Sequence, residues 1–123
     1  MATAEEVFKA LNEKAGFEPD NENWDENTFT WKDIAPCKVY IYFQTETEKG
    51  ANNPNFGFCR GDGLGKREFE NIRVELGNII NDHVEDDGAF IFAYVEDLAD
   101  RSVDWALKMM QELERRILFE LST

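Results

Sequence analysis

The chain has 123 residues, which is enough for one domain with its own hydrophobic core. Its 26 acidic and 13 basic residues give a formal net charge of −13, which opposes direct binding to nucleic acid or to an anionic membrane and favours basic partners. A hydrophobic content of 42% with ten Phe residues excludes a disordered chain, so we expect a single ordered domain over residues 1–123.

The N-terminal segment predicts a short helix rather than a targeting signal. Thr3 and Glu6 have the spacing of a capping box, and apolar residues recur on one helical face until Gly16, which predicts a helix over 4–15. The segment lacks a basic region followed by an apolar one, and the chain contains no apolar run of about eighteen residues. We therefore expect a soluble, cytoplasmic protein.

Residues 17–36 have mostly the composition of a loop. Pro19, several Asn residues and a run of acids favour a loop. Over 28–31, however, threonine and aromatic residues alternate, which is typical of a short edge strand. We expect the aromatic side chains of this arm to pack onto the sheet as a lid rather than to form an exposed recognition patch. These side chains are Trp24, Phe29 and Trp31.

The segment 37–47 has the clearest strand pattern in the chain. Its side chains alternate between two faces, one with Cys37, Val39, Ile41 and Phe43 and the other with Tyr40 and Tyr42. Apolar or aromatic side chains on both faces are typical of a strand inside a sheet. We therefore place this strand in the middle of the sheet.

Two further strands and two long helices are expected in the rest of the chain. Turn residues over 48–54 lead into a second strand, which predicts a β-hairpin with 37–47. Apolar residues at helical spacing predict the two helices. A segment that is apolar on both faces predicts the last strand. The strands are expected over 55–60 and 89–95, and the helices over 66–82 and 102–121.

These elements predict an α+β fold in the order α-β-β-α-β-α. A right-handed crossover through the middle helix would return the chain parallel to strand 55–60, so the vacant position for strand 89–95 is the far side of strand 37–47. This reasoning predicts an antiparallel sheet of three to four strands in the order 55–60, 37–47, 89–95. The two long helices are expected to pack on one face of that sheet.

The two cysteines do not form a disulfide framework in a chain of this size. Cys37 and Cys59 fall on neighbouring predicted strands, where buried, reduced thiols are the common arrangement. A cross-strand disulfide is the alternative, and it requires an oxidising compartment.

No motif in the chain specifies a reaction. The glycine-rich loop from Arg60 to Lys66 precedes a helix, but it has the glycine spacing of neither a P-loop nor a dinucleotide fingerprint. The acidic turn 82–88 does not place Asp and Glu at the two ends of a calcium loop. His83, the one histidine, is not spaced with either cysteine for a zinc site, and the two serines lie at a helix cap and in the tail. We therefore expect no catalytic residue, no metal and no cofactor, and a protein that is not an enzyme.

Acidic residues are clustered at 18–26, 85–87 and 96–104. Clustered carboxylates can bind a metal, act as an acid–base pair or imitate the phosphates of nucleic acid, although they most often form a solvated surface. The high net charge favours imitation of nucleic acid more than is usual. The expected partner-binding residues are Glu22, Asp25, Glu26, Asp86, Asp87 and Glu96.

The order of strands and aromatic residues resembles that of a known group of proteins. The pattern is V-Y-I-Y-F-Q-T-E, a loop, N-F-G-F-C-R, a helix, A-F-I-F-A-Y and a long final helix. Over residues 24–121 it is similar to the C-terminal accessory region of PD-(D/E)XK nuclease-like bacterial proteins. The resemblance implies a recognition or regulatory module of a nucleic-acid-processing or defence system. No lysine has Asp or Glu two positions before it, so the catalytic signature of that family is absent and no catalytic residue is carried over.

These observations predict a non-enzymatic, acidic protein-interaction module, an inhibitor or nucleic-acid-mimicking antagonist of a basic, nucleic-acid-binding protein. The alternative is an accessory or regulatory domain of a nuclease or defence system, whose acidity serves only solubility. The two functions differ in salt dependence, because a complex that forms by charge attraction weakens as ionic strength rises.

Overall fold

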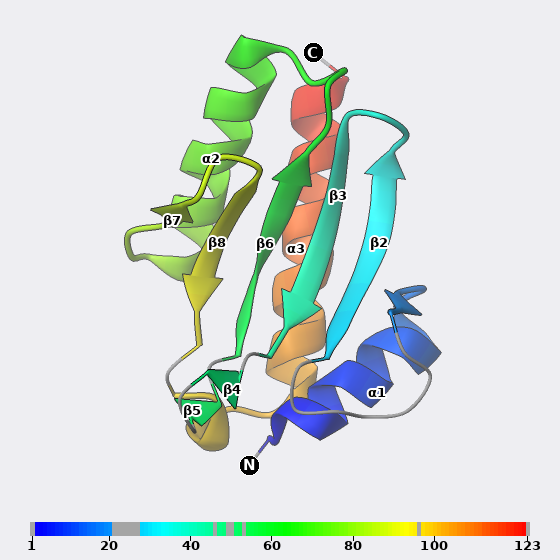
Figure 1. The fold of residues 1–123 in the computed structure, drawn as a ribbon, viewed down its shortest axis with the longest axis vertical. Helices are drawn as coiled ribbons and strands as arrows, with labels where there is room; N and C mark the ends of the chain where they lie inside the picture. Colours follow the sequence, from blue (N-terminus) through cyan, green and yellow to red (C-terminus); the bar gives the residue numbers. More distant parts are fainter. Residues whose placement is uncertain are drawn as a thin grey trace.

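A six-stranded sheet is the central element of the fold (Figure 1). The computed structural model describes residues 2–20, 28–45, 47–48, 51–52, 54–95 and 97–122. Every neighbouring pair of strands in the sheet is antiparallel. The spatial order is β1 (Glu18–Pro19), β2 (Phe29–Ala35), β3 (Val39–Gln44), β6 (Asn55–Arg60), β8 (Phe90–Tyr94) and β7 (Glu85–Asp86). A separate two-stranded sheet contains β4 (Thr47–Glu48) and β5 (Ala51–Asn52).

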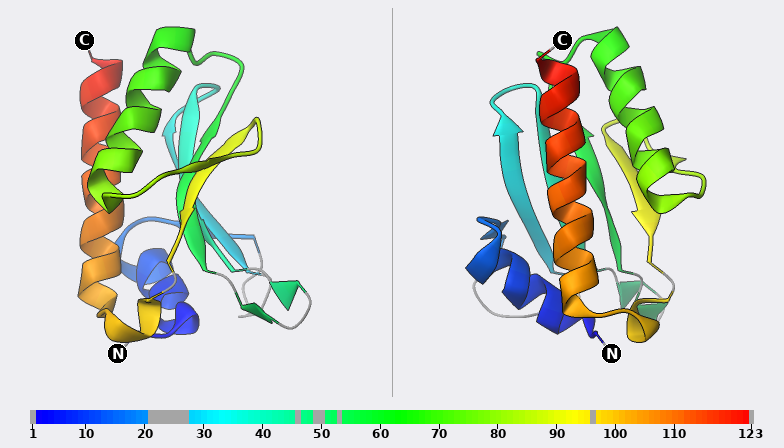
Figure 2. Two further views of the ribbon diagram at one scale, coloured as in Figure 1. Left: turned by 90° about the vertical axis from the view of Figure 1, so that its left-hand side faces the viewer. Right: turned by 180° about the vertical axis from the view of Figure 1, so that it is seen from behind.

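Three helices cover one face of the large sheet, as the two views of Figure 2 show. They are α1 (Ala4–Lys14), α2 (Lys66–Ile80) and α3 (Val103–Leu121), and a short 3-10 turn, η1 (Leu98–Asp100), precedes α3. The predicted capping box is present at the start of α1, and the Ser102 hydroxyl caps α3 by accepting a hydrogen bond from the Trp105 backbone N–H at 3.0 Å. The predicted α+β class is therefore confirmed.

The sheet is larger than predicted, and its strand order differs. β8 pairs with β6 instead of β3, because β2 occupies the far side of β3. The crossover through α2 leads to β7, which runs parallel to β6 since both strands are antiparallel to β8. The sequence-based order was wrong because it missed β7, a strand of two residues that reverses the chain between α2 and β8.

The predicted interior position of strand 37–47 is confirmed, since β3 lies between β2 and β6. The strand begins only at Val39, because the preceding residues turn the chain from β2, with Cys37 at a φ of 64°. Both cysteines are free thiols, and Cys37 is exposed whereas Cys59 is buried. The expectation of a buried, reduced thiol is therefore correct for Cys59 and wrong for Cys37.

The segment predicted as a short edge strand begins β2, a strand of seven residues with β1 on one side and β3 on the other. Phe29 and Trp31 belong to this strand and are half-buried on the face turned away from the helices. They are part of the sheet, not a lid over the core. Trp24 lies outside the described residues.

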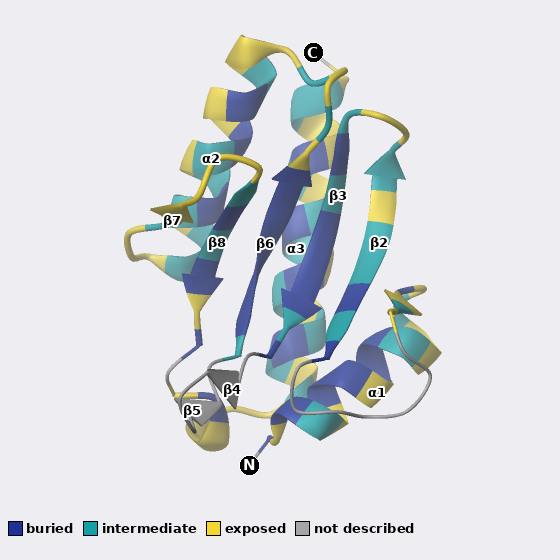
Figure 3. Cartoon of the chain, viewed as in Figure 1, coloured by how far each residue is buried: buried dark blue, intermediate teal, exposed yellow. Residues whose placement is uncertain are grey.

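The hydrophobic core lies between the sheet and the helices. Figure 3 shows that β3 and β6 are mostly buried. Alternate residues of the strands face the helices, and the helices contribute residues at a spacing of three or four. The fully buried residues of this cluster are Val7, Leu11, Ile41, Phe58, Ile72, Leu76, Ile91, Leu113 and Ile117.

The other face of the sheet is covered with aromatic rings. Tyr42, with no exposed surface, stacks on Phe29 at 5.3 Å between ring centres and meets Phe90 edge-on at 5.3 Å. Gly57 lies opposite Tyr42 in the neighbouring strand, where β6 and β8 approach closely. A Cβ atom at Gly57 would lie 1.9 Å from the Ile91 carbonyl oxygen, so only glycine fits there.

Candidate protein-binding cleft

The acidic residues predicted to bind a partner are described only in part. Asp86 and Asp87 are exposed at the turn between β7 and β8, where their carboxylates accept hydrogen bonds from the backbone N–H groups of Gly88 (2.8 Å) and Phe90 (3.0 Å). The other predicted residues, Glu22, Asp25, Glu26 and Glu96, lie outside the described residues.

The acidic segments lie at opposite edges of the sheet. Glu18 and Asp20, the described members of the first cluster, are exposed at and beside β1, which is the edge strand farthest from β7. Asp86 lies in β7 at the other edge. The first cluster therefore does not join the second along one edge of the sheet.

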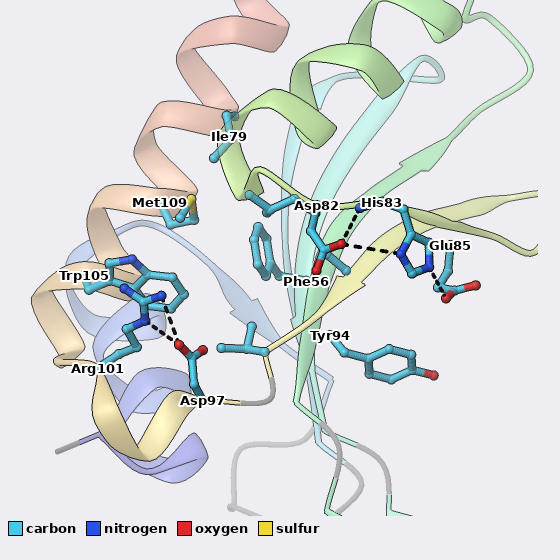
Figure 4. Close-up of a pocket in the computed structure, with 13 residues that line it drawn as sticks. Phe56, Ile79, Asp82, His83, Glu85, Tyr94, Asp97, Arg101, Trp105 and Met109 are labelled. Carbon is cyan, nitrogen blue, oxygen red and sulfur yellow. Dashed lines mark hydrogen bonds and ion pairs between the residues drawn. The ribbon is translucent and has the colours of Figure 1, made fainter.

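A cleft of about 530 Å³ lies where the end of β8, the end of α2 and the start of α3 come together (Figure 4). It brings residues of the acidic clusters 85–87 and 96–104 to its two rims. One rim contains Asp82, His83 and Glu85, and the other contains Asp97, Arg101 and Trp105. The remaining lining residues are mostly apolar, namely Phe56, Ile79, Ile80, Ala93, Tyr94, Val95 and Met109.

The rim at the start of α3 holds a guanidinium group. Both Nε and Nη2 of Arg101 lie 3.0 Å from Oδ2 of Asp97, and the guanidinium carbon lies 4.8 Å from the centre of a Trp105 ring. An aromatic face attracts a cation at this distance. Because the three residues flank η1 and the capped start of α3, local secondary structure fixes their backbone positions.

The opposite rim begins where α2 ends. Asn81 adopts the left-handed conformation, with a φ of 54°, and turns the chain out of the helix. The backbone N–H of His83 then donates to the Asp82 carboxylate at 2.7 Å, and its Nε2 lies 2.9 Å from Oε1 of Glu85. The hydrogen bond with Glu85 raises the pKa of His83 above its ordinary value. A protonated imidazole would neutralise part of the charge on this rim.

Three acidic residues, Asp82, Glu85 and Asp97, line the cleft together with Arg101 and His83, and the two segments that form its rims are acidic as a whole. Between Asn81 and Leu107 the sequence contains eight Asp or Glu residues, and Arg101 is its one Lys or Arg. On the outer surfaces of α2 and α3, by contrast, acids are paired with arginines. Hydrogen bonds from Arg115 and Arg116 lower the pKa of Glu112 to about 2.

Sequence reasoning included Asp97 in an acidic cluster but did not identify the cleft, and it missed Arg101 and Trp105 altogether. The isolation of Arg101 among eight acids was a signal that could have drawn attention to it. No signal in the sequence indicated that the two acidic segments meet, because that depends on the position of β7 beside β8.

A second hollow of about 440 Å³ lies on the aromatic face of the sheet. Phe29, Trp31, Cys37 and Tyr40 are among the residues that line it. Burial and a hydrogen bond with the Cys59 side chain raise the pKa of Tyr40 further above physiological pH. Asp33 and Lys38 also line the hollow, so its aromatic surface carries one charge of each sign, unlike the acidic cleft.

Among the described residues, no three His, Cys, Asp or Glu side chains are grouped so that they could hold a metal ion. In the same part of the chain, no helix is both long and apolar enough to cross a membrane. Comparisons with protein-family models, with curated proteins and with solved structures find no match to this chain.

Proposed function

We propose that this chain is a non-enzymatic, acidic protein-interaction module that binds a basic, nucleic-acid-binding protein as its inhibitor or antagonist. The observation that carries the proposal is the cleft, where acids from two separate segments flank an apolar floor. Acidic rims attract a basic surface, and an apolar floor gives it a contact from which water is excluded. A surface that was acidic only for solubility would need no such hollow.

The charge of the chain supports the same function through the rate of association. A net charge of −13 on a small domain produces a field that speeds encounter with a basic protein and weakens as salt screens it. Exposed acids such as Asp86 and Asp87 contribute to this field without needing direct contact with the partner. Their neutralisation should therefore slow association more than it accelerates dissociation.

The test begins with capture of partners from an extract of the native host by the immobilised full chain at low salt. Association and dissociation rates of a captured basic protein are then measured across a series of salt concentrations. We expect the affinity to fall as salt rises, and the triple variant Asp86→Asn, Asp87→Asn, Glu96→Gln to associate more slowly than wild type.

A matched control separates position from total charge. Glu5, Glu13 and Glu70 lie on α1 and α2, away from the cleft, and their replacement by Gln changes the net charge by the same amount. The control variant should associate faster than the variant with Asp86, Asp87 and Glu96 replaced. An affinity that is constant between low and high ionic strength and indifferent to both triple variants would contradict the proposed function.

The aromatic face of the sheet favours a second candidate, an accessory or regulatory domain of a nuclease or defence system. Half-buried rings such as Trp31 and Phe92 could be covered by a neighbouring domain. This function predicts salt-independent binding that Trp31→Ser weakens and the acidic variants leave unchanged. Measuring the same captured partner with both sets of variants distinguishes the two functions.

A further inference from the structure

The acidic cleft already holds one guanidinium group, that of Arg101. This group has a carboxylate partner, Asp97, and an aromatic face, Trp105, which are the two contacts by which proteins recognise arginine side chains. The rim is thus built for a planar cation. A ligand that binds at this rim would need the same chemistry as the Arg101 side chain, a planar cation that can pair with Asp97 and stack on Trp105.

The contact between Arg101 and Asp97 can open readily. The Arg101 side chain is 43% exposed and that of Asp97 51%, so water screens their attraction. Arg116 provides a contrast, because it is held by Glu75 at 2.6 Å and Glu112 at 2.8 Å and is 32% exposed. Of these two arginines, Arg101 is the one that a competing cation can replace.

The rest of the cleft suits the remainder of an arginine side chain. Its apolar floor, which includes Phe56, Val95 and Met109, can cover the three methylene groups that precede a guanidinium. Asp82 on the opposite rim supplies a second carboxylate within the same cavity. A cavity of about 530 Å³ is large enough to admit a side chain of this size while Arg101 moves outward.

We propose that the cleft binds an arginine side chain of the basic partner, whose guanidinium group takes the place of Arg101 between Asp97 and Trp105. This inference rests on the proposed function and names the group that the module recognises. Arg101 acts as an internal competitor, which occupies the site until a partner arrives. Lysine should bind more weakly, because its ammonium group cannot stack on Trp105 or form two parallel hydrogen bonds with a carboxylate.

The test uses acetyl-arginine amide as the probe and the ¹⁵N-labelled full chain as the receptor. Its matched control is acetyl-citrulline amide, which has nearly the same shape and no charge. We expect the arginine probe to shift the Trp105 indole N–H signal and the Asp82 and Asp97 amide signals along one saturable curve. The citrulline compound should leave these signals in place.

Variants test the role of the internal arginine. Arg101→Ala removes the competitor and should raise the affinity for the arginine probe by about two- to tenfold. Arg73→Ala is the control, since Arg73 also forms an exposed ion pair, with Glu70 on α2, and its loss changes the net charge equally. It should leave the affinity almost unchanged. Adding Asp97→Asn to Arg101→Ala should remove the gain.

Several results would overturn the inference. It is wrong if the Trp105 signal does not move, if citrulline binds as well as arginine, or if Arg73→Ala raises the affinity as much as Arg101→Ala. If the arginine probe fails while a basic partner still binds in a salt-dependent way, the proposed function stands and the cleft is not its arginine site. If the arginine probe binds the cleft saturably but the affinity for the partner does not change with salt, the arginine site is supported and the proposed function is wrong.

Discussion

Replacing Gly57 by alanine should destabilise the protein by forcing two central strands apart. The new Cβ would lie 1.9 Å from the Ile91 carbonyl oxygen, 2.7 Å from Phe92 Cα and 2.9 Å from the Ile91 carbonyl carbon. All three atoms belong to the backbone of β8, so no side chain can rotate to relieve the contact. Since carbon and oxygen atoms normally stay about 3.3 Å apart or more, the contact between β6 and β8 would have to lengthen by about 1.4 Å.

Two costs add up to the expected loss of stability. Overpacking inside a well-packed structure typically costs about 1–3 kcal/mol, and each weakened hydrogen bond between β6 and β8 costs about 1 kcal/mol more. We therefore expect Gly57→Ala to lower the free energy of unfolding by about 3 kcal/mol. This is a large part of the roughly 5–15 kcal/mol that is typical of a single domain.

A second glycine provides the control for Gly57. A Cβ at Gly77, inside α2, would contact only the Asp82 carbonyl oxygen, at an ordinary distance of 3.7 Å. Gly77→Ala should therefore raise the free energy of unfolding by about 0.5–1 kcal/mol, because alanine is the better helix former. Urea titration followed by circular dichroism measures both changes as opposite shifts of the midpoint. A free energy of unfolding for Gly57→Ala within about 0.5 kcal/mol of the wild-type value would mean that β8 tolerates the added Cβ, contrary to this prediction.

Three further predictions concern the cap of α1 and two ion pairs. Thr3→Ala removes the capping box, in which the Glu6 backbone N–H donates to Thr3 Oγ1 at 3.2 Å, and should lower the free energy of unfolding by about 1 kcal/mol in the same titration. The Glu112 pKa, lowered to about 2, means that its carboxylate stabilises the fold above the pKa of the unfolded chain and loses this effect as pH falls. The difference in urea midpoint between wild type and Glu112→Gln should therefore shrink from about pH 5 towards pH 2. Because the pKa of His83 is raised, its ion pair with Glu85 stabilises the fold at low pH, and this stabilisation is lost as pH rises through the folded pKa. Glu85→Gln should therefore lower the pKa of the imidazole in an NMR titration.

Each of these predictions has a clear contrary result. An unchanged midpoint for Thr3→Ala would mean that the cap adds nothing to stability. A midpoint difference for Glu112→Gln that is as large in acid as at neutral pH would exclude its carboxylate as the cause. The titration of His83, the one histidine, can be followed without assignment, and an identical curve in Glu85→Gln would exclude Glu85 as the source of its shift.

The helices and the interior strand could be predicted because each has a periodic pattern. The buried residues of α3 are Ala106, Met110, Leu113 and Ile117, at intervals of three or four, and those of β3 include Val39, Ile41 and Phe43, at intervals of two. β1 and β7 could not be predicted in this way, because a strand of two residues is too short to show alternation. Their sequences, Glu-Pro and Glu-Asp, are also unfavourable for strands, so backbone pairing with a longer neighbour holds them in place.

The cleft shows a similar division between what sequence can and cannot predict. The clusters of acids were visible, since their members are close together in the chain. The placement of Glu85 and Asp97 on the two rims of one cleft could not be predicted. It requires β7 to lie outside β8 and the chain to return across the end of the sheet to α3. Trp105 carried no special signal either, since one aromatic residue in the first turn of a helix is most simply interpreted as part of its packing.

The short outer strands have a consequence for behaviour in concentrated solution. Among the described residues, β1 is in register with Thr30 and Trp31 of β2, and β7 with Ile91 and Phe92 of β8. Beyond β1, the edge of β2 carries Lys32 and Asp33 and then an irregularity in its register. Charges and irregularities at an edge hinder the addition of strands from other molecules. The protein should therefore resist fibril growth by strand addition.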